Sequence, residues 1–410
     1  MEWYGSERWR VLKGVLLCSG AFLFALTAAL TSDELPQSEQ VFGAISPSDV
    51  ANTPYGFYPA GTRLGRWISG EEFETIAAQL AVTSRPDISF DGTRMLLSAL
   101  TGPDSVAQIW ELNTDSGKPR QMFSSARASF SPHYLPNNRI VYSQLVGEPG
   151  EGLGLQSRLF TSELDGSDQT QITFGEGFQR IIQILPDGRI LYGSFDSPED
   201  PPSQIAVRPD GTEADLYVTQ RALVASSDEY ITFSERLPLA FRKHLRENRP
   251  GFRKTTPLPT DDGDIVDVFT AASRPRPPIA TSVVKPGLDH GWLLCLDASE
   301  STFSIPSREV SAVRVWDSAA DRLLGSAPVE ADGSFFLEVP ADRSLRLEIV
   351  DAEGKTLAEQ GSGIWVRPNE SRGCIGCHED RTLSPENRIP LAVSKPAVKI
   401  AEAREKEVQS

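Results

Sequence analysis

The chain has 410 residues, which is enough for two or three domains with a hydrophobic interior. Its 40 Lys and Arg residues against 56 Asp and Glu residues give a formal net charge of -16. This charge repels nucleic acids and anionic lipid headgroups, so the sequence predicts no nucleic-acid role.

Residues 1–32 have the pattern of an export signal. Charged and aromatic residues up to Lys13 precede a run of 16 residues without a charge, Val15 to Leu30. This run is between the length of a signal-peptide core and the roughly 20 residues that span a bilayer. Small residues around Ala28 favour cleavage, and retention as an N-terminal anchor is the alternative. We expect a periplasmic or otherwise exported protein, with anchoring in the inner membrane as the other outcome.

Residues 50–245 contain a weak repeat that is clearest at its turns. A strand, a tight turn and a second strand recur at 85–97, 128–142 and 182–192. The turns are Asp-Gly or Asn-Asn pairs, which readily take the positive backbone angles of a hairpin.

A second phase of the repeat covers 109–113, 159–166 and 204–211. Corresponding turns are 50 residues apart at Asn137 and Asp187, and 45 apart at Asp165 and Asp210. Four short strands in such a period are typical of a β-propeller blade. The repeats also resemble the blades of TolB-type and WD40-like propellers. We expect an all-β fold with about three clear blades and one or two degenerate ones.

The composition changes after residue 245. Seven prolines between 246 and 287 predict a linker. Short alternating strands and Asp-Gly or Glu-Gly turns between 288 and 370 predict a β-sandwich-like domain. A haem-binding segment is expected at 371–390. The tail, 391–410, is rich in Lys, Glu and Ala and predicts a frayed helix or a disordered end.

The segment 374–378 carries the strongest chemical signal. It reads Cys374-Ile375-Gly376-Cys377-His378. Two thiols three positions apart can bind the two vinyl groups of a haem, and the adjacent histidine can bind the iron as the proximal ligand. The segment therefore predicts one covalent haem c. Cys18 lies in the apolar N-terminal run, so Cys295 remains as a single further cysteine with no expected partner.

Three other interpretations of this segment are weaker. A thioredoxin-like dithiol is typical of a βαβ setting, which the surrounding strands do not provide. A zinc ribbon uses a second cysteine pair, which the sequence lacks. A surface disulfide is the third alternative.

The sixth iron ligand is not specified by the motif. A Met or second His would suit an electron carrier, whereas an open position would admit a small ligand. The candidates are Met95, Met122, His133, His244, His290 and Cys295, and among these His290 is the preferred one. Three arginines near the motif are candidate partners of the haem propionates, namely Arg372, Arg381 and Arg388.

The run from Ile364 through the motif to Arg388 resembles the haem-bearing middle domain of the hydrazine synthase alpha subunit family. Proteins of that family place a β-propeller before this domain, as the order of elements predicts here. In the synthase, a tyrosine four residues after the motif histidine binds the haem iron, and the histidine helps to bind zinc. Thr382 stands at the tyrosine position, so the resemblance does not extend to hydrazine-forming activity. What it implies instead is a small zinc site with Cys295, His290 and His378 as candidates.

These observations lead to three functional hypotheses. The preferred one is an exported monohaem redox protein whose propeller docks a redox partner protein. The second is a propeller binding or scaffold protein in which the motif holds a structural haem or zinc. The third is an enzyme acting on a small nitrogen or oxygen species at an open haem iron. No catalytic triad, phosphate-binding loop or paired-carboxylate motif is evident in the sequence.

Overall fold

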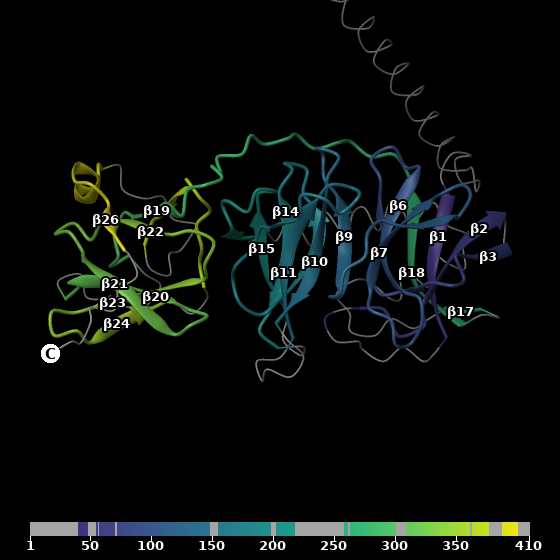
Figure 1. Cartoon of the computed structure of the whole chain (residues 1–410), viewed down its shortest axis with the longest axis horizontal. Coiled ribbons are helices and arrows are strands. Elements are labelled where there is room, and N and C mark those ends of the chain that lie inside the picture. The colour runs from purple at the N-terminus through teal and green to yellow at the C-terminus, as the bar shows by residue number, and fades with distance from the viewer. Residues whose placement is uncertain are drawn as a thin grey trace, which may run out of the picture.

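The computed structural model describes residues 40–47, 55, 57–69, 72–147, 155–197, 202–217, 258–260, 263–300, 309–360, 363–376 and 388–400. Within these residues the chain is built from β-sheets of four or five strands, so the all-β class is confirmed. Figure 1 shows a propeller-like array of sheets followed by a smaller domain of two sheets. The predicted export segment, 1–32, lies outside the described residues. Among the described residues, no helix has the length and apolarity needed to cross a membrane.

The first sheet joins an early and a late part of the chain. Its strand order is β17-β18-β1-β2-β3, with β1 at Gln40–Ser46, β2 at Arg63–Ser69, β3 at Glu72–Ile76, β17 at Leu258–Thr260 and β18 at Gly263–Ala271. The rings of Phe42 and Phe269 stack across β1 and β18 at 5.9 Å. The linker boundary at residue 246 is therefore wrong for residues 258–271. Apolar residues of β18 pack into the array, and Pro259 is tolerated because β17 is an edge strand.

The next three sheets follow the repeat in the sequence. The second contains β4 (Ala81–Val82), β5 (Asp87–Ile88), β6 (Arg94–Leu100), β7 (Gln108–Asn113) and β8 (Pro119–Gln121). The third contains β9 (Ser129–Tyr134), β10 (Ile140–Val146), β11 (Gln156–Ser162) and β12 (Thr170–Gln171). The fourth contains β13 (Phe178–Ile184), β14 (Ile190–Phe195), β15 (Ser203–Val207) and β16 (Asp215–Leu216).

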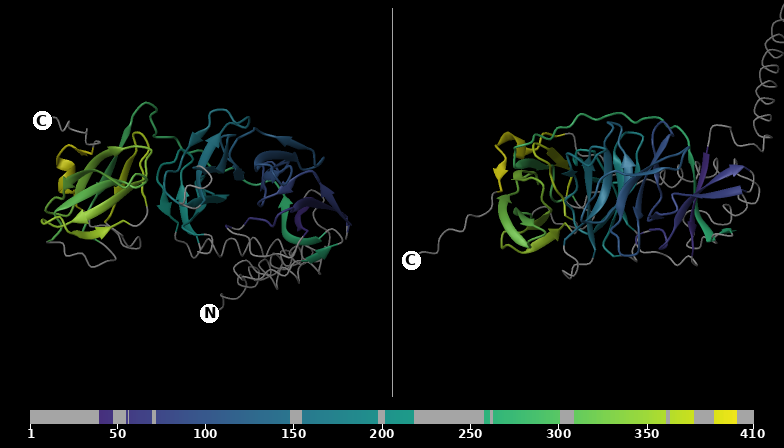
Figure 2. Two further views of the ribbon diagram at one scale, coloured as in Figure 1. Left: turned by 60° about the horizontal axis from the view of Figure 1, so that its bottom comes forward. Right: turned by 45° about the vertical axis from the view of Figure 1, so that its right-hand side comes forward.

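Hairpin turns of these sheets adopt the backbone that the sequence predicts. Gly92, Asn138 and Gly188 have φ angles of 78°, 65° and 88°. Such angles favour Gly and Asn over residues with larger side chains. Figure 2 shows the sheets following one another around an arc. Apolar clusters between neighbouring sheets, such as the stacked rings of Phe130 and Phe178 at 5.2 Å, hold the arc together.

Residues 272–289, here called the strap, run along one side of the array from β18 to the second domain (Figure 1). Its first arginine, Arg274, donates hydrogen bonds of 2.8 Å to the carboxylate of Asp87 and the carbonyl of Ile88. Arg276 bonds the third sheet and Ser282 bonds Asp210 after β15. The strap thus contacts the turns of three successive sheets, so its prolines stiffen an ordered connection.

The second domain consists of two stacked four-stranded sheets. One has the order β25-β19-β22-β26, with β19 at His290–Cys295, β22 at Phe335–Pro340, β25 at Ser371–Cys374 and β26 at Val398–Lys399. The other has the order β21-β20-β23-β24, with β20 at Ala312–Asp317, β21 at Arg322–Pro328, β23 at Leu345–Val350 and β24 at Thr356–Glu359. Alternate residues of both sheets fill one core, as in a sandwich.

The expected tail is ordered in its first part. Residues Leu391–Ser394 form a 3-10 helix, η2, and β26 adds a parallel strand to β22. Ala392 and Ile400 are buried, at 5% and 3% exposure. The prediction of a frayed or disordered end is therefore wrong for 391–400, because these two apolar side chains pack into the domain.

The strap contact can be tested by substituting a glycine beneath it. A Cβ atom at Gly188 would lie 2.5 Å from the carbonyl oxygen of Pro278. Gly287, within the strap, has a similar φ of 94° but no atom within 4 Å of its Cβ position, so Gly287→Ala is the matched control. We expect Gly188→Ala to lower the free energy of unfolding by about 1–3 kcal/mol more than the control does.

The measurements are urea unfolding and limited thermolysin cleavage at Ile279 and Val283, two exposed apolar residues of the strap. Cleavage should accelerate in Gly188→Ala and not in Gly287→Ala. Equal behaviour of the two variants would show that the strap is not held by this turn.

Candidate functional site

The motif-bearing strand β25 lies at the edge of its sheet, against β19. The two strands run parallel, with Leu293 opposite Arg372 and Cys295 opposite Cys374. The amide of Trp292 donates to the carbonyl of Glu370 at 2.8 Å, where this pairing begins. The first cysteine of the motif is therefore placed by the β19 ladder.

The pairing continues beyond the end of both strands. The amides of Leu296 and Asp297 donate to the carbonyls of Cys374 and Ile375, both at 3.0 Å. At the next position, a Cβ atom on Gly376 would overlap the carbonyl oxygen of Glu300. The second variable position of the motif thus requires glycine here. Cys377 and His378 lie outside the described residues.

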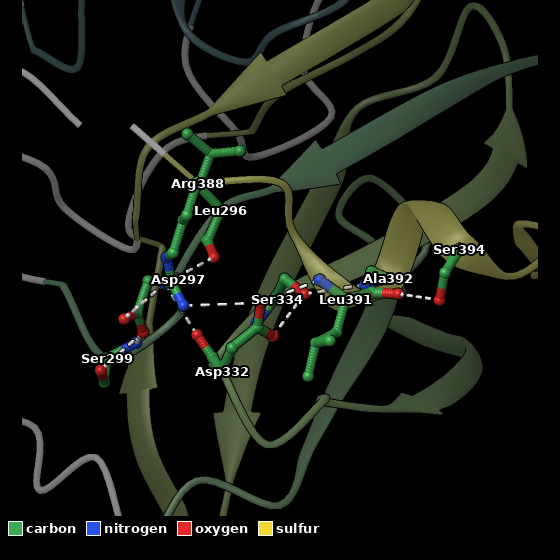
Figure 3. A network of polar contacts seen from close by, with 9 residues as sticks. All are labelled: Leu296, Asp297, Ser299, Asp332, Ser334, Arg388, Leu391, Ala392 and Ser394. Carbon is green, nitrogen blue, oxygen red and sulfur yellow. Dashed lines mark hydrogen bonds and ion pairs between the residues drawn. The ribbon is translucent and has the colours of Figure 1, made fainter. Parts of the chain in front are cut away.

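The chain after the motif is held at the same place by Arg388 (Figure 3). Its guanidinium donates to the carbonyl of Asp332 at 2.9 Å, to that of Leu296 at 3.3 Å and to the Asp297 carboxylate at 3.2 Å. The Asp332 carboxylate in turn accepts the amide of Leu391 at 2.8 Å. Arg388 therefore clamps the chain after the motif to Leu296, Asp297 and Asp332, and its pairing with a haem propionate stays a prediction.

The two described cysteines lie in different environments. Cys295 is 2% exposed in the sandwich core, whereas Cys374 is half-buried at the end of the edge strand. Cys295 is the ladder neighbour of Cys374, although the two are 79 positions apart in the chain. Sequence distance conceals this neighbourhood, which depends on the register of β19 and β25.

His290 lies at the opposite end of β19 from Cys295. Five residues of extended strand separate their Cα atoms by about 16 Å, and an odd offset turns their side chains to opposite faces. The ring of His290 packs edge-on against Trp292 at 5.3 Å, and its Nδ1 lies 2.9 Å from the Asp289 carboxylate. The predicted zinc pair of Cys295 and His290 is therefore wrong. No group of three metal-binding side chains occurs in the described part of the chain.

The remaining candidates for the sixth iron ligand belong to the propeller-like array. Met95 and Met122 are buried in the apolar clusters of that array, and His133 lies on β9 with its Nδ1 3.2 Å from the Ser131 carbonyl. Burial lowers the pKa of His133. His244 and Arg381 lie outside the described residues. Cys295 is the candidate that the described structure brings beside the motif.

The segment 363–372 joins the motif to the fourth sheet of the array. Trp365 is 4% exposed and packs into the apolar cluster of the third and fourth sheets. Its indole Nε1 donates to the carbonyl of Gly211 at 3.0 Å. Arg372 donates to the carbonyls of Trp365 and Ala214, and its guanidinium is 3.7 Å from the Asp215 carboxylate. These bonds make Arg372 a contact between the two domains, and its pairing with a haem propionate stays a prediction.

Glu370 is a buried carboxylate at this interface. One oxygen accepts the amide of Glu213 at 2.9 Å and the other accepts the amide of Arg367 at 2.7 Å. Burial raises the pKa of Glu370, although the two amides and the nearby charge of Arg372 oppose the rise. A single carboxylate therefore links the fourth sheet to the turn that precedes β25.

Sequence reasoning did not assign roles to Trp365, Glu370 or Glu300. Each acts through a contact with a residue far away in the chain, so local spacing carries no signal for it. Trp365, nine positions before the motif, was the one residue whose type indicated a buried contact, because a large aromatic side chain is usually packed against other residues.

The buried carboxylate gives a testable pH dependence. Because its pKa is raised in the folded chain, Glu370 contributes most stability below its unfolded-state pKa, about 4.3, and the contribution is lost as the pH rises through the folded pKa. In E370Q the second amide loses its acceptor, which costs roughly 1–3 kcal/mol. We expect the wild-type advantage over E370Q to shrink between pH 4 and pH 7.

The measurement is urea unfolding across this pH range. Glu353→Gln is the matched control, because Glu353 is an exposed residue at a turn. A wild-type curve that runs parallel to that of E370Q at every pH would contradict the assignment.

Comparisons with known proteins agree with this architecture. Residues 297–379 match the family described as hydrazine synthase alpha subunit middle domain. None of the curated proteins compared matches the sequence. The structure of Kuenenia stuttgartiensis hydrazine synthase superposes with a TM-score of 0.65 at 15% identity, over 88% of this chain and 72% of that chain.

TolB from Acinetobacter baumannii superposes with a TM-score of 0.33 at 14% identity, over 48% of this chain and 45% of that chain. The profile match includes the whole segment 374–378, and the fold match extends over both parts of the chain. The chain thus resembles the hydrazine synthase alpha subunit family, and its residues 297–379 match the middle domain of that family.

Proposed function

We propose that the chain is an exported protein that carries one covalent haem c, with thioether bonds to Cys374 and Cys377 and His378 as the proximal iron ligand. The observation that carries the proposal is the setting of the motif. Its first cysteine is half-buried at the end of an edge strand that pairs with β19. The turn at 296–300 bonds Cys374 and Ile375 and, after the motif, Arg388.

The residues present fit such a haem. Cys374 is half-buried, in contrast to Cys295, which is 2% exposed. The close approach of Gly376 to Glu300 fixes the backbone between the two cysteines of the motif. A bound haem would supply a one-electron couple. The chain's own contribution is to hold the two thiols and the histidine on one anchored loop.

We propose further that the four sheets of the array are blades of a β-propeller that docks a redox partner. The first sheet supports this proposal, because pairing of β1 with β18 joins early and late strands of the array. A net charge of -16 favours a partner with a basic surface. Export is proposed on the residues 1–32 together with the need for haem attachment to occur outside the cytoplasm.

Covalent haem can be tested directly. The full chain is co-expressed with a cytochrome c maturation system, beside the double variant C374A/C377A. We expect haem staining on a denaturing gel and a pyridine haemochrome spectrum from the wild type, and neither from the variant. Absence of covalent haem in the wild type would overturn the proposal and leave the array, as a binding scaffold, the main functional element.

The glycine of the motif offers a second test. Gly376→Ala places a methyl group against the Glu300 carbonyl, whereas Gly373→Ala, the matched control, meets no atom within 4 Å. A clash of about 1–3 kcal/mol would disfavour the present backbone of the motif by a factor of roughly 5 to 150. The yield of covalent haem per chain, measured from the haemochrome spectrum, should fall in G376A only. Equal yields would show that the segment adjusts its backbone without cost.

A further inference from the structure

Cys295 and Cys374 are direct neighbours in the sheet. They are opposite one another in the parallel ladder of β19 and β25. Adjacent strands lie about 4.7–4.9 Å apart, and disulfides join Cα atoms that are roughly 4.4–6.8 Å apart. The backbone separation is therefore already in the range that a disulfide uses.

The two side chains also share a face of the sheet. Residues opposite one another on parallel strands point to the same side. On β19 the buried positions are Gly291, Leu293 and Cys295, and on β25 the better-covered positions are Arg372 and Cys374. Both thiols thus lie on the covered side, at the ends of their strands.

β25 is the strand that can adjust. It forms the edge of its sheet, it has four residues, and Cys374 is its last one. β19 is held between β22 and β25, so Cys295 is fixed in the core. A small movement at the end of an edge strand costs less than a movement of a central strand.

We propose that Cys295 and Cys374 form a disulfide in the haem-free chain, and that this bond must be reduced before haem can be attached. The second half rests on the proposed function, whereas the disulfide itself stands on the pairing alone. Under oxidising conditions Cys295 then prevents haem attachment at Cys374, and reduction restores it.

The chemistry is a thiol–disulfide exchange with a dithiol-forming oxidant, such as oxidised glutathione or an oxidised thiol oxidoreductase. The oxidant first forms a mixed disulfide with the accessible Cys374 and releases one thiol. Cys295 then loses its proton to solvent and attacks the Cys374 sulfur, which releases the second thiol of the oxidant. Two cysteine thiols are oxidised and one oxidant disulfide is reduced to two thiols. A dithiol reductant reverses both steps.

The bond would block the first thioether position. A Cys374 sulfur bonded to Cys295 cannot add to a vinyl group, and Cys377 alone would leave the haem attached at one side. In the loaded protein Cys374 is occupied, so Cys295 returns to its place as a buried thiol.

The test uses the full chain produced without a cytochrome c maturation system. The protein is equilibrated with oxidised glutathione, its remaining thiols are blocked with N-ethylmaleimide after unfolding, and the peptides are mapped by mass spectrometry. We expect a Cys295–Cys374 linked peptide and a blocked Cys377. The same link should form in Cys377→Ser, the matched control that removes the other cysteine of the motif, and it should be lost in Cys295→Ser.

A Cys374–Cys377 link with Cys295 blocked, or blocked Cys295 and blocked Cys374 in both the wild type and Cys377→Ser, would overturn the inference. A second measurement compares covalent haem yield from the oxidised wild type with and without dithiothreitol, which we expect to differ by tenfold or more. Haem attachment in a chain that forms no Cys295–Cys374 link would contradict the disulfide inference and leave the proposed function intact. A link with no haem attachment after full reduction would sink the proposed function alone.

Discussion

Burial of the Trp365 indole against the fourth sheet is the contact on which the position of the motif depends. The ring lies edge-on to Phe174 at 6.4 Å and contacts Gly175, and its nitrogen is satisfied by the Gly211 carbonyl. Removal of such a side chain from an apolar cluster typically costs about 3–5 kcal/mol. This contact is large enough to fix one domain against the other.

The residues after Trp365 extend the same interface towards β25. Arg367 donates to the Gln171 carbonyl at 2.8 Å and lies over the Phe174 ring, and Glu370 and Arg372 bond backbone groups at 213 and 214. Most of these partners are backbone atoms of turns. The interface is therefore formed mainly with the backbone of the third and fourth sheets. It depends little on the side chains that these sheets carry. The strap provides a second connection along the other sheets, so the two domains are joined twice.

The sequence predicted local features such as turns, but it did not predict which strands pair or in which register. Asp-Gly and Asn-Asn turns located the hairpins, because their backbone preferences are set by adjacent residues. The prolines between 246 and 287 led to the prediction of a linker where β18 lies. This strand pairs with β1, which is more than 200 positions earlier in the chain. The composition of the charged tail did not predict β26, which is flanked by the buried side chains of Ala392 and Ile400. In both cases the prediction was based on the composition of a whole segment, and it missed the few apolar side chains that pack into the fold.

The candidate site shows the same division. The spacing of the motif identified its chemistry, since thioether attachment needs two thiols at a fixed interval. The sequence could not reveal that Cys295 neighbours Cys374 while His290 lies a strand length away, because five positions in a strand separate residues that five positions in a helix would bring closer. Cys295 and His290, both on β19, were thus predicted to share one zinc site, although only Cys295 lies beside the motif.

The turn at 296–300 has a central place in this arrangement. Leu296 and Asp297 bind the first two residues of the motif through backbone hydrogen bonds, and Glu300 limits Gly376. Asp297 also accepts a bond from Arg388 after the motif. Asp297 is itself fixed by the amide and hydroxyl of Ser299 at 2.9 and 2.6 Å. Both ends of the motif-bearing segment are therefore anchored by five consecutive residues of the sandwich. The array sets the direction of β25 through Trp365, whereas this turn fixes the backbone from Cys374 to Gly376.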